Sequence, residues 1–153
     1  MTTFTIREPR LADYDDWKIL FDGYNAFYGR EGPTALPLEV TEATWKRIHD
    51  PKEPVHALVA EQDGKLVGLT HYLYHRTTLA VALTCYLQDL FTAPQARGQG
   101  IARSLIEAVY EKATEARAQR VYWQTHETNK VAQRVYDQIA ERSGFIVYRH
   151  ALE

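Results

Sequence analysis

The sequence has 153 residues, of which 45% are hydrophobic and 25% are charged, and its formal net charge is −2. This length suffices for one hydrophobic core and is too short for two, so residues 1–153 are predicted to form a single domain. The charge leaves no basic excess for nucleic acid, no apolar run could span a membrane, and no signal-peptide region begins the chain, so we expect a cytoplasmic protein.

The first half of the chain is predicted to contain a short strand, two helices and three further strands. Trp17, Phe21 and Tyr24 recur at helical spacing and predict an amphipathic helix. The pair Asp63-Gly64 between two apolar runs is a strong hairpin signal. In chain order, the predicted elements are a strand at 4–6, helices at 13–27 and 41–49, and strands at 56–61, 66–75 and 83–91.

The second half is predicted to alternate helices and strands. Its first helix carries Ile101, Leu105 and Val109 on one side. Cys85, the only cysteine, lies in an apolar strand-like run and is predicted to be a core residue rather than a nucleophile. The predicted elements are helices at 101–117 and 130–143 and strands at 120–125 and 145–150. Together they predict a mixed α/β fold in which helices cover a largely antiparallel sheet.

The most informative stretch is Arg97-Gly98-Gln99-Gly100-Ile101-Ala102, between a predicted strand and a predicted helix. The first N–H groups of a helix lack partners within it, and the helix dipole adds positive charge there, so this turn suits a phosphate. A P-loop needs Lys-Ser or Lys-Thr after the glycines, and a dinucleotide fingerprint needs Gly or Ala where Arg103 stands. Both are excluded, and a phosphate-bearing cofactor of another kind is expected.

The same stretch resembles the Gln/Arg-x-x-Gly-x-Gly/Ala signature of the GNAT superfamily of N-acetyltransferases, with Arg97, Gly100 and Ala102 in its fixed positions. Asn129 to Tyr136, followed by Gly144-Phe145, is similar to the second half of that family. The step from Tyr136 to Gly144 is longer than in many members of the family, and this pattern is most similar to that of the subgroup of histone/polyamine-type acetyltransferases. The resemblance implies a GNAT-like twisted sheet with splayed central strands and acetyl-CoA as donor. The sequence has no metal-ligand motif, and no metal is expected.

The resemblance also implies how the donor binds. The pyrophosphate would lie on the amides of the glycine turn, and the strand edge before the turn would pair with the pantetheine amides like an added strand. Asn129 would hydrogen-bond the pantetheine arm, and its alternative role is that of a helix N-cap. The implied cofactor-binding residues are Leu90, Phe91, Thr92, Arg97, Gly98, Gln99, Gly100, Ile101, Ala102, Arg103, Asn129 and Ala132.

Tyr136 occupies the family's tyrosine position and is the candidate general acid. A phenol with a pKa near 10 stays protonated at neutral pH and can donate a proton to the departing CoA thiolate. The alternative is an ordinary aromatic residue that packs on the sheet.

Asp89 is the candidate general base. Polyamine acetyltransferases of this superfamily have an acidic pair on the strand before the glycine turn, and here the pair reads Gln88-Asp89. By alternation Asp89 is expected to share a sheet face with Leu87 and Phe91, which would put a carboxylate in apolar surroundings. The alternatives are a purely structural carboxylate at this position, or a base supplied by His71, His75, His126 or Glu127.

In the resembling family, acceptor specificity lies in the first two helices and the loop between them. Tyr24, Phe27, Tyr28 and Glu31 lie in this region, and aromatic and acidic side chains suit a cationic acceptor with some apolar body.

We therefore expect an N-acetyltransferase that acetylates a primary amine, on a small molecule, a polyamine, a lysine or an N-terminus, by direct attack in a ternary complex. The alternatives are a catalytically silent CoA-binding regulatory or interaction module, and transfer of another acyl group. The predicted strand from Phe145 to Tyr148 is expected to pair across a homodimer, as in the resembling subgroup.

Overall fold

The computed structural model describes residues 3–153 as two units, one that extends to Trp123 and a second at Gln124–Glu153. The first unit contains β1 (Thr5–Arg7), α1 (Tyr14–Phe27), α2 (Leu38–Ile48), β2 (Val55–Gln62), β3 (Lys65–His75), β4 (Thr84–Thr92), α3 (Ile101–Glu115) and β5 (Val121–Tyr122). Short 3-10 turns lie at Leu11–Asp13, Gly32–Thr34 and Pro94–Ala96. The second unit contains α4 (Lys130–Ile139).

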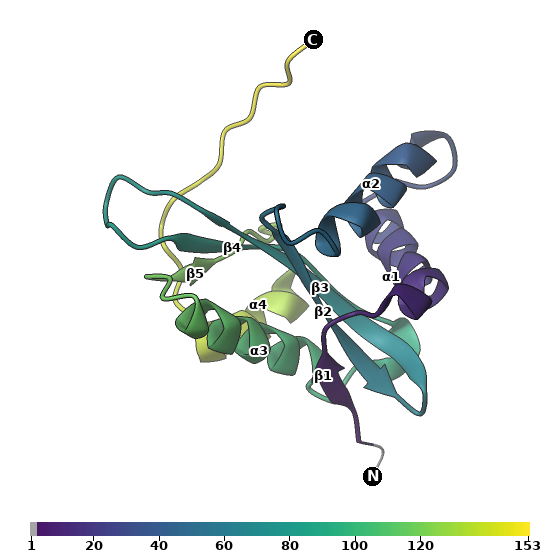
Figure 1. Ribbon diagram of the computed structural model, residues 1–153. Coiled ribbons are helices and arrows are strands. Elements are labelled where there is room, and N and C mark those ends of the chain that lie inside the picture. The colour runs from purple at the N-terminus through teal and green to yellow at the C-terminus, as the bar shows by residue number, and fades with distance from the viewer. Residues whose placement is uncertain (1–2) are drawn as a thin grey trace. The chain divides into compact units, whose positions relative to one another are not determined.

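The strands form one sheet in the order β1-β2-β3-β4-β5 (Figure 1). The first three pairs are antiparallel, and β4 pairs with β5 in parallel. Asp63 and Gly64 have φ values of 53° and 75° and join β2 to β3 in a two-residue hairpin. The predicted mixed α/β fold with a largely antiparallel sheet is confirmed.

Helices cover both faces of this sheet in the first unit. α1 and α2 pack on one face, whereas α3 packs on the other (Figure 1). On the first face, Trp17 and Phe21 from α1 pack with Val59 and Leu69 in a buried cluster. On the second face, Gly68 allows α3 to approach closely, because a Cβ atom there would lie 2.9 Å from Ile101 Cγ2.

The two central strands separate after a short stretch of pairing. β5 pairs with β4 only through Cys85↔Val121 and Tyr86↔Tyr122. From Leu87 to Thr92, this edge of β4 therefore has no partner strand among the described residues 3–153. The free edge is the splay that the family resemblance implies, and it leaves backbone N–H and C=O groups of β4 open to an added strand.

Gln88 is the extra residue of a β-bulge in β4. His71 pairs with Asp89 and Tyr72 pairs with Leu87, so no residue of β3 opposes Gln88. Because cross-strand partners share a sheet face, Asp89 lies on the face of His71, and Leu87 lies on the face of Tyr72. The prediction that Asp89 and Leu87 share a face is wrong, because the bulge shifts the alternation by one residue.

The predicted final strand at 145–150 is not formed. Residues 140–153 have no helix or strand, and the side chains of Phe145 and Tyr148 are each 89% exposed. The pattern predicts a strand from apolar and β-branched side chains, but a strand also needs a neighbour for its backbone hydrogen bonds, and this segment has none among residues 3–153. α4 accordingly ends at Ile139 rather than 143, and β5 is limited to its two paired residues.

Within residues 3–153, no helix is long and apolar enough to cross a membrane. The same described residues contain no group of three or more His, Cys, Asp or Glu side chains that could hold a metal ion.

Candidate active site

Asp89 lies at the free edge of β4, on the sheet face that α1 covers. The side chain is 13% exposed. Its Oδ2 atom lies 2.8 Å from Nδ1 of His71 on β3, and Nε2 of His71 lies 3.0 Å from Nε1 of Trp17 on α1. The bulge at Gln88 places Asp89 on the same sheet face as His71, so that these two side chains and Trp17 are hydrogen-bonded in a row. In a regular strand, Asp89 would share a face with Leu87 instead.

The hydrogen bonds fix the tautomer of His71. An indole N–H can only donate, so Nε2 of His71 accepts from Trp17 and the ring proton lies on Nδ1. Nδ1–H then donates to Oδ2 of Asp89. The side chain is 3% exposed, and both ring nitrogens are hydrogen-bonded within the protein. His71 therefore orients the Asp89 carboxylate and has no free nitrogen with which to accept a proton from a substrate.

Two tyrosines of α1 and its C-terminal end lie beside the same carboxylate. The Tyr24 hydroxyl lies near the Asp89 carboxylate. Burial raises the pKa of Tyr24, and the negative charge of Asp89 raises it further. Burial and the charge of Asp89 also raise the pKa of Tyr28, which is 43% exposed. Both phenols therefore stay neutral at physiological pH and can act as hydrogen-bond donors.

Arg30 is a cation beside Tyr24 and Tyr28, and it is not among the site residues predicted from the sequence. Its guanidinium carbon lies 5.8 Å from the Tyr24 ring centre and 5.5 Å from the Tyr28 ring centre. Its charge lowers the pKa of both tyrosines, against the effect of Asp89. Sequence spacing alone gives no sign of this arrangement, because Arg30 follows a Gly29 turn with a φ value of 80° that folds the chain back on the helix end.

The glycine turn after β4 presents open backbone. Gly98 and Gly100 both have a φ value of 82°, and an added Cβ atom would meet nothing within 4 Å at either position. Gly100 is the N-cap of α3. Among the described residues, no backbone acceptor partners the amides of 98–102. These amides, with the positive end of the helix dipole, can bind an anionic group.

The charged side chains of the turn are engaged within the protein. Arg97 Nε donates to the Thr92 carbonyl at 3.2 Å, and its guanidinium carbon lies 5.7 Å from the Phe91 ring centre. Arg103 Nε donates to Glu107 at 2.8 Å. The Arg97 bond uses only its Nε–H, so a phosphate contact through its terminal nitrogens does not require it to give up the Thr92 carbonyl.

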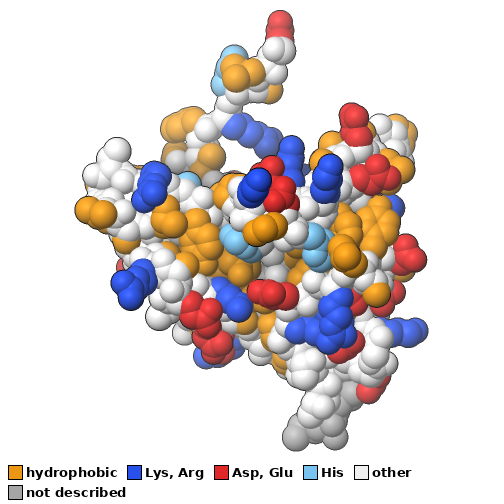
Figure 2. Space-filling model, viewed as in Figure 1, with side chains coloured by type: hydrophobic (Ala, Val, Ile, Leu, Met, Phe, Trp, Pro, Cys, Tyr) orange, Lys and Arg blue, Asp and Glu red, His pale blue; other side chains and the backbone are white. Residues whose placement is uncertain are grey.

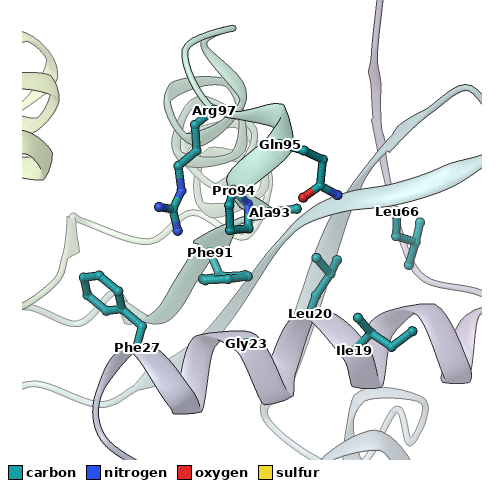
Figure 3. A pocket seen from close by; sticks show the side chains of 10 residues that line it. All are labelled: Ile19, Leu20, Gly23, Phe27, Leu66, Phe91, Ala93, Pro94, Gln95 and Arg97. Carbon is teal, nitrogen blue, oxygen red and sulfur yellow. The ribbon is translucent and has the colours of Figure 1, made fainter.

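An apolar groove of about 490 Å³ lies between α1 and the end of β4 (Figure 3). Its walls include Ile19, Phe27 and Phe91, and Arg97 reaches over it from the glycine turn. Gly23 makes this packing possible, because a Cβ atom there would lie 2.9 Å from the Phe91 ring. The structure thus separates the predicted acceptor residues. Tyr24 and Tyr28 lie beside Asp89, and Phe27 lines the groove.

The remaining predicted residues of the first unit lie elsewhere or are buried. Glu31 is exposed at the start of a 3-10 turn. His75 Nδ1 donates to the Arg76 carbonyl, and its Nε2 bonds the Tyr122 hydroxyl, each at 2.8 Å. Cys85 is fully buried, as predicted, and burial raises the pKa of its thiol to about 11. On the face shown in Figure 2, cationic and anionic side chains are interspersed.

In the second unit, Asn129 caps α4. Its side-chain oxygen accepts a hydrogen bond from the Ala132 amide at 3.2 Å. The N-cap role that the sequence left open is therefore formed, and the side-chain NH₂ group can still donate elsewhere. Tyr136 lies seven residues further on, nearly two turns along the same helix face. His126 Nδ1 lies 2.7 Å from the Thr128 hydroxyl.

Comparison with known proteins decides the family. The Acetyltransferase (GNAT) family matches residues 17–140. The chain belongs to the GNAT family of acetyltransferases. The D-amino-acid N-acetyltransferase HPA3 of Saccharomyces cerevisiae is 33% identical over 144 residues, which cover 93% of this chain and 86% of that protein. YhfO of Bacillus subtilis, an uncharacterized N-acetyltransferase, is 30% identical over 145 residues, which cover 94% of each chain.

The fold agrees with this assignment. The aminoglycoside N-acetyltransferase AAC(6')-Iy, whose structure is known in complex with CoA, superposes with a TM-score of 0.81 at 18% identity and covers 99% of this chain and 96% of its own. As a member of this family with an N-acetyltransferase relative at 33% identity, the protein is an acetyl-CoA-dependent acyltransferase. Its free β4 edge and the open amides of its glycine turn fit such a donor.

Proposed function

We propose that this GNAT protein transfers the acetyl group of acetyl-CoA to the primary amine of a small molecule or peptide by direct attack in a ternary complex. The observation that carries the proposal is the position of Asp89. It is a partly exposed carboxylate at the free edge of β4, held by His71 and beside Tyr24. A carboxylate fixed where an acceptor can reach it is suited to remove a proton from an ammonium group.

Acetyl-CoA supplies an acetyl group bound as a thioester. In our proposal, the amides from Gly98 to Arg103 hold its pyrophosphate, with Arg97, Gln99, Ile101 and Ala102 in the same turn. Leu90, Phe91 and Thr92 offer backbone groups to its pantetheine arm, and Asn129 and Ala132 at the start of α4 belong to the same donor site. The open glycines and the unpaired strand edge support the first two assignments, and the family resemblance supports the third.

The proposed proton transfers use two residues. Asp89 accepts a proton from the acceptor ammonium, directly or through a water molecule, so that the neutral nitrogen can form the new C–N bond. Tyr136 donates its hydroxyl proton to the sulfur that leaves as the C–S bond breaks. The nitrogen that has formed the C–N bond carries one proton more than the amide, and this proton leaves to solvent as the product forms. Asp89 returns its proton to solvent and Tyr136 takes one up, so the sum is an N-acetylated product, a free thiol and one released proton.

The acceptor is proposed to bind beside Tyr24 and Tyr28, with Phe27 and Glu31 at the margin of the site. The relatives act on different acceptors, since HPA3 is a D-amino-acid N-acetyltransferase and AAC(6')-Iy is an aminoglycoside N-acetyltransferase. An amine is the group that these acceptors have in common. The contact of Tyr24 with Asp89 supports an acceptor amine at this position.

The first test is thiol release from acetyl-CoA with a panel of amino acids, polyamines, aminoglycosides and lysine peptides. We expect turnover with at least one class of amine and none with matched alcohols. The protein's own thiol does not disturb the assay, because Cys85 is fully buried and burial raises its pKa to about 11. Turnover with alcohols alone would contradict the proposed function.

A catalytically silent CoA-binding module is the second candidate. The observation that favours it is Gln88, an amide where the resembling polyamine acetyltransferases have a carboxylate. In the structure Gln88 is the exposed residue of the bulge, and Asp89 makes the contacts. Acetyl-CoA binding without turnover on any amine in the panel would favour this candidate.

A homodimer is proposed through residues 145–148. Phe145, Ile146, Val147 and Tyr148 are 63% to 89% exposed, and such an apolar segment is suited to pair with the same segment of a second copy. Sedimentation at micromolar concentration should give a dimer, and deletion of residues 145–153 should give a monomer. Deletion of 151–153 alone is the control and should leave the dimer intact. A monomeric full chain would contradict this proposal.

A further inference from the structure

We propose that the acceptor carries a carboxylate beside its amine, and that Arg30 binds this carboxylate. The acceptor class is thus a free amino acid. This inference rests on the proposed N-acetyltransferase function and selects one class of acceptor within it.

Arg30 is held in a fixed position by a buried amide. Its Nε–H donates to Oδ1 of Asn25 at 2.8 Å, and its backbone N–H donates to the Asn25 carbonyl at 2.8 Å. Asn25 is 4% exposed, and its own Nδ2 donates to the Phe21 carbonyl at 2.9 Å. This arrangement fixes the orientation of the guanidinium plane through one of its five N–H donors.

The terminal nitrogens of Arg30 have no acceptor among the described residues 3–153, and no Asp or Glu in that part of the chain forms an ion pair with it. The guanidinium instead lies 5.8 Å and 5.5 Å from the ring centres of Tyr24 and Tyr28. A partly buried guanidinium that keeps its four terminal N–H groups is pre-organised to bind a carboxylate through two parallel hydrogen bonds.

A carboxylate of the protein lies at the other end of the same tyrosine. The Tyr24 hydroxyl lies near enough to Asp89 for the carboxylate charge to raise its pKa, and the Arg30 guanidinium carbon lies 5.8 Å from the centre of the Tyr24 ring. Opposite charges therefore flank Tyr24, and no ion pair between Arg30 and Asp89 forms in the described residues. An amino acid has the complementary pair of charges. Its ammonium matches Asp89, where the proposed deprotonation takes place, and its carboxylate matches Arg30.

The same charges disfavour the other amines. A polyamine or an aminoglycoside would bring a further ammonium group toward Arg30, which is a like-charge contact. A peptide N-terminus has an amide where the free amino acid has a carboxylate, and the carbon beside a lysine ε-amine carries no carboxylate. Such an acceptor would leave the guanidinium without an anionic partner.

The test compares each amino acid with its own amide and its decarboxylated amine in the thiol-release assay. A panel of racemic alanine, leucine, phenylalanine, lysine and glutamate keeps the side chain constant within each set and removes stereochemical preference as a variable. For at least one set, kcat/KM for the amino acid should exceed that for the amide and the amine by about 10-fold or more, which is the effect of hydrogen bonds to a charged group.

Arg30→Met should lower kcat/KM for the amino acid by about 10- to 100-fold and change that for the amide by less than about threefold, so that the two become similar. Arg30→Lys should retain part of the preference for the amino acid over its amide. The lysine ammonium keeps the positive charge but cannot donate two parallel hydrogen bonds to a carboxylate. Arg47→Met, a matched loss of one exposed positive charge on α2, should leave the preference unchanged.

Three results would overturn the inference. One is a wild-type enzyme that uses amides or decarboxylated amines as well as amino acids, which would leave the N-acetyltransferase function standing. Another is an equal loss for amino acid and amide in Arg30→Met, which is the result expected from a merely structural arginine. The third is an absence of turnover with every amine, which would overturn the proposed function as well.

Discussion

Replacement of Asp89 by asparagine should lower kcat at neutral pH by about 10²- to 10⁴-fold, the usual contribution of a positioned general base. The substitution is nearly isosteric. The asparagine oxygen can still accept the Nδ1–H of His71, so the hydrogen bonds that orient this position are kept. The amide cannot accept the proton of an ammonium group, and only this ability is lost.

The pH dependence separates a base from a structural residue. An acceptor amine that is already neutral needs no base, so the deficit of Asp89→Asn should shrink as the pH rises toward the pKa of the amine. That pKa is about 8 for a peptide α-amine and higher for a free amino acid, whose carboxylate stabilises the ammonium form. Initial rates from pH 6.5 to 9.5 measure this effect, and thermal unfolding checks the fold. Gln88→Ala, at the exposed neighbouring position, is the control and should keep near wild-type rates. A deficit that is constant with pH, or kcat within threefold of wild type, would contradict the role of Asp89 as base.

The order of elements could be predicted because it depends on local patterns. The hairpin turn at Asp63-Gly64 follows from two residues that tolerate positive φ values. The helix at Ile101 follows from a glycine turn and an apolar stripe, and its start coincides with the predicted one. The strand predicted at 145–150 does not form for a non-local reason, because its side-chain pattern fits a strand but no segment in the described part of the chain pairs with it.

The environment of Asp89 could not be predicted from alternation. A single extra residue, Gln88, reverses which face the following residues occupy, and no feature of the local sequence marks it as a bulge. The sequence offers His71 as an alternative base, but in the structure both of its ring nitrogens are hydrogen-bonded to Trp17 and Asp89. The bulge on β4 and the indole of Trp17, 54 residues away in sequence from His71, together decide this outcome.

Arg30 is a second contact that a linear reading does not reveal. The aromatic and acidic composition of residues 24–31 predicts a cationic acceptor. In the folded chain, Asn25 turns the Arg30 guanidinium onto the two tyrosines, and the site then contains both signs of charge. The expected acceptor changes accordingly from a cation to a zwitterion.

Tyr136→Phe should lower kcat by about 10²-fold or more, because it removes only the hydroxyl that we propose as the proton donor to the leaving thiolate. The apolar ring is retained, so α4 and its Asn129 cap should be unaffected. KM for acetyl-CoA and the dissociation constant of CoA should change by less than about threefold, since an interaction made in the transition state affects kcat rather than ground-state binding.

The measurement is steady-state thiol release with the best acceptor, together with CoA binding by calorimetry. Tyr148→Phe is the matched control, because it removes the same hydroxyl from a side chain that is 89% exposed, and it should keep wild-type kcat. Weakened CoA binding with kcat unchanged would make Tyr136 a donor-binding residue. Wild-type values for all three constants would leave it as an aromatic packing residue, and the departing sulfur would then take its proton from water.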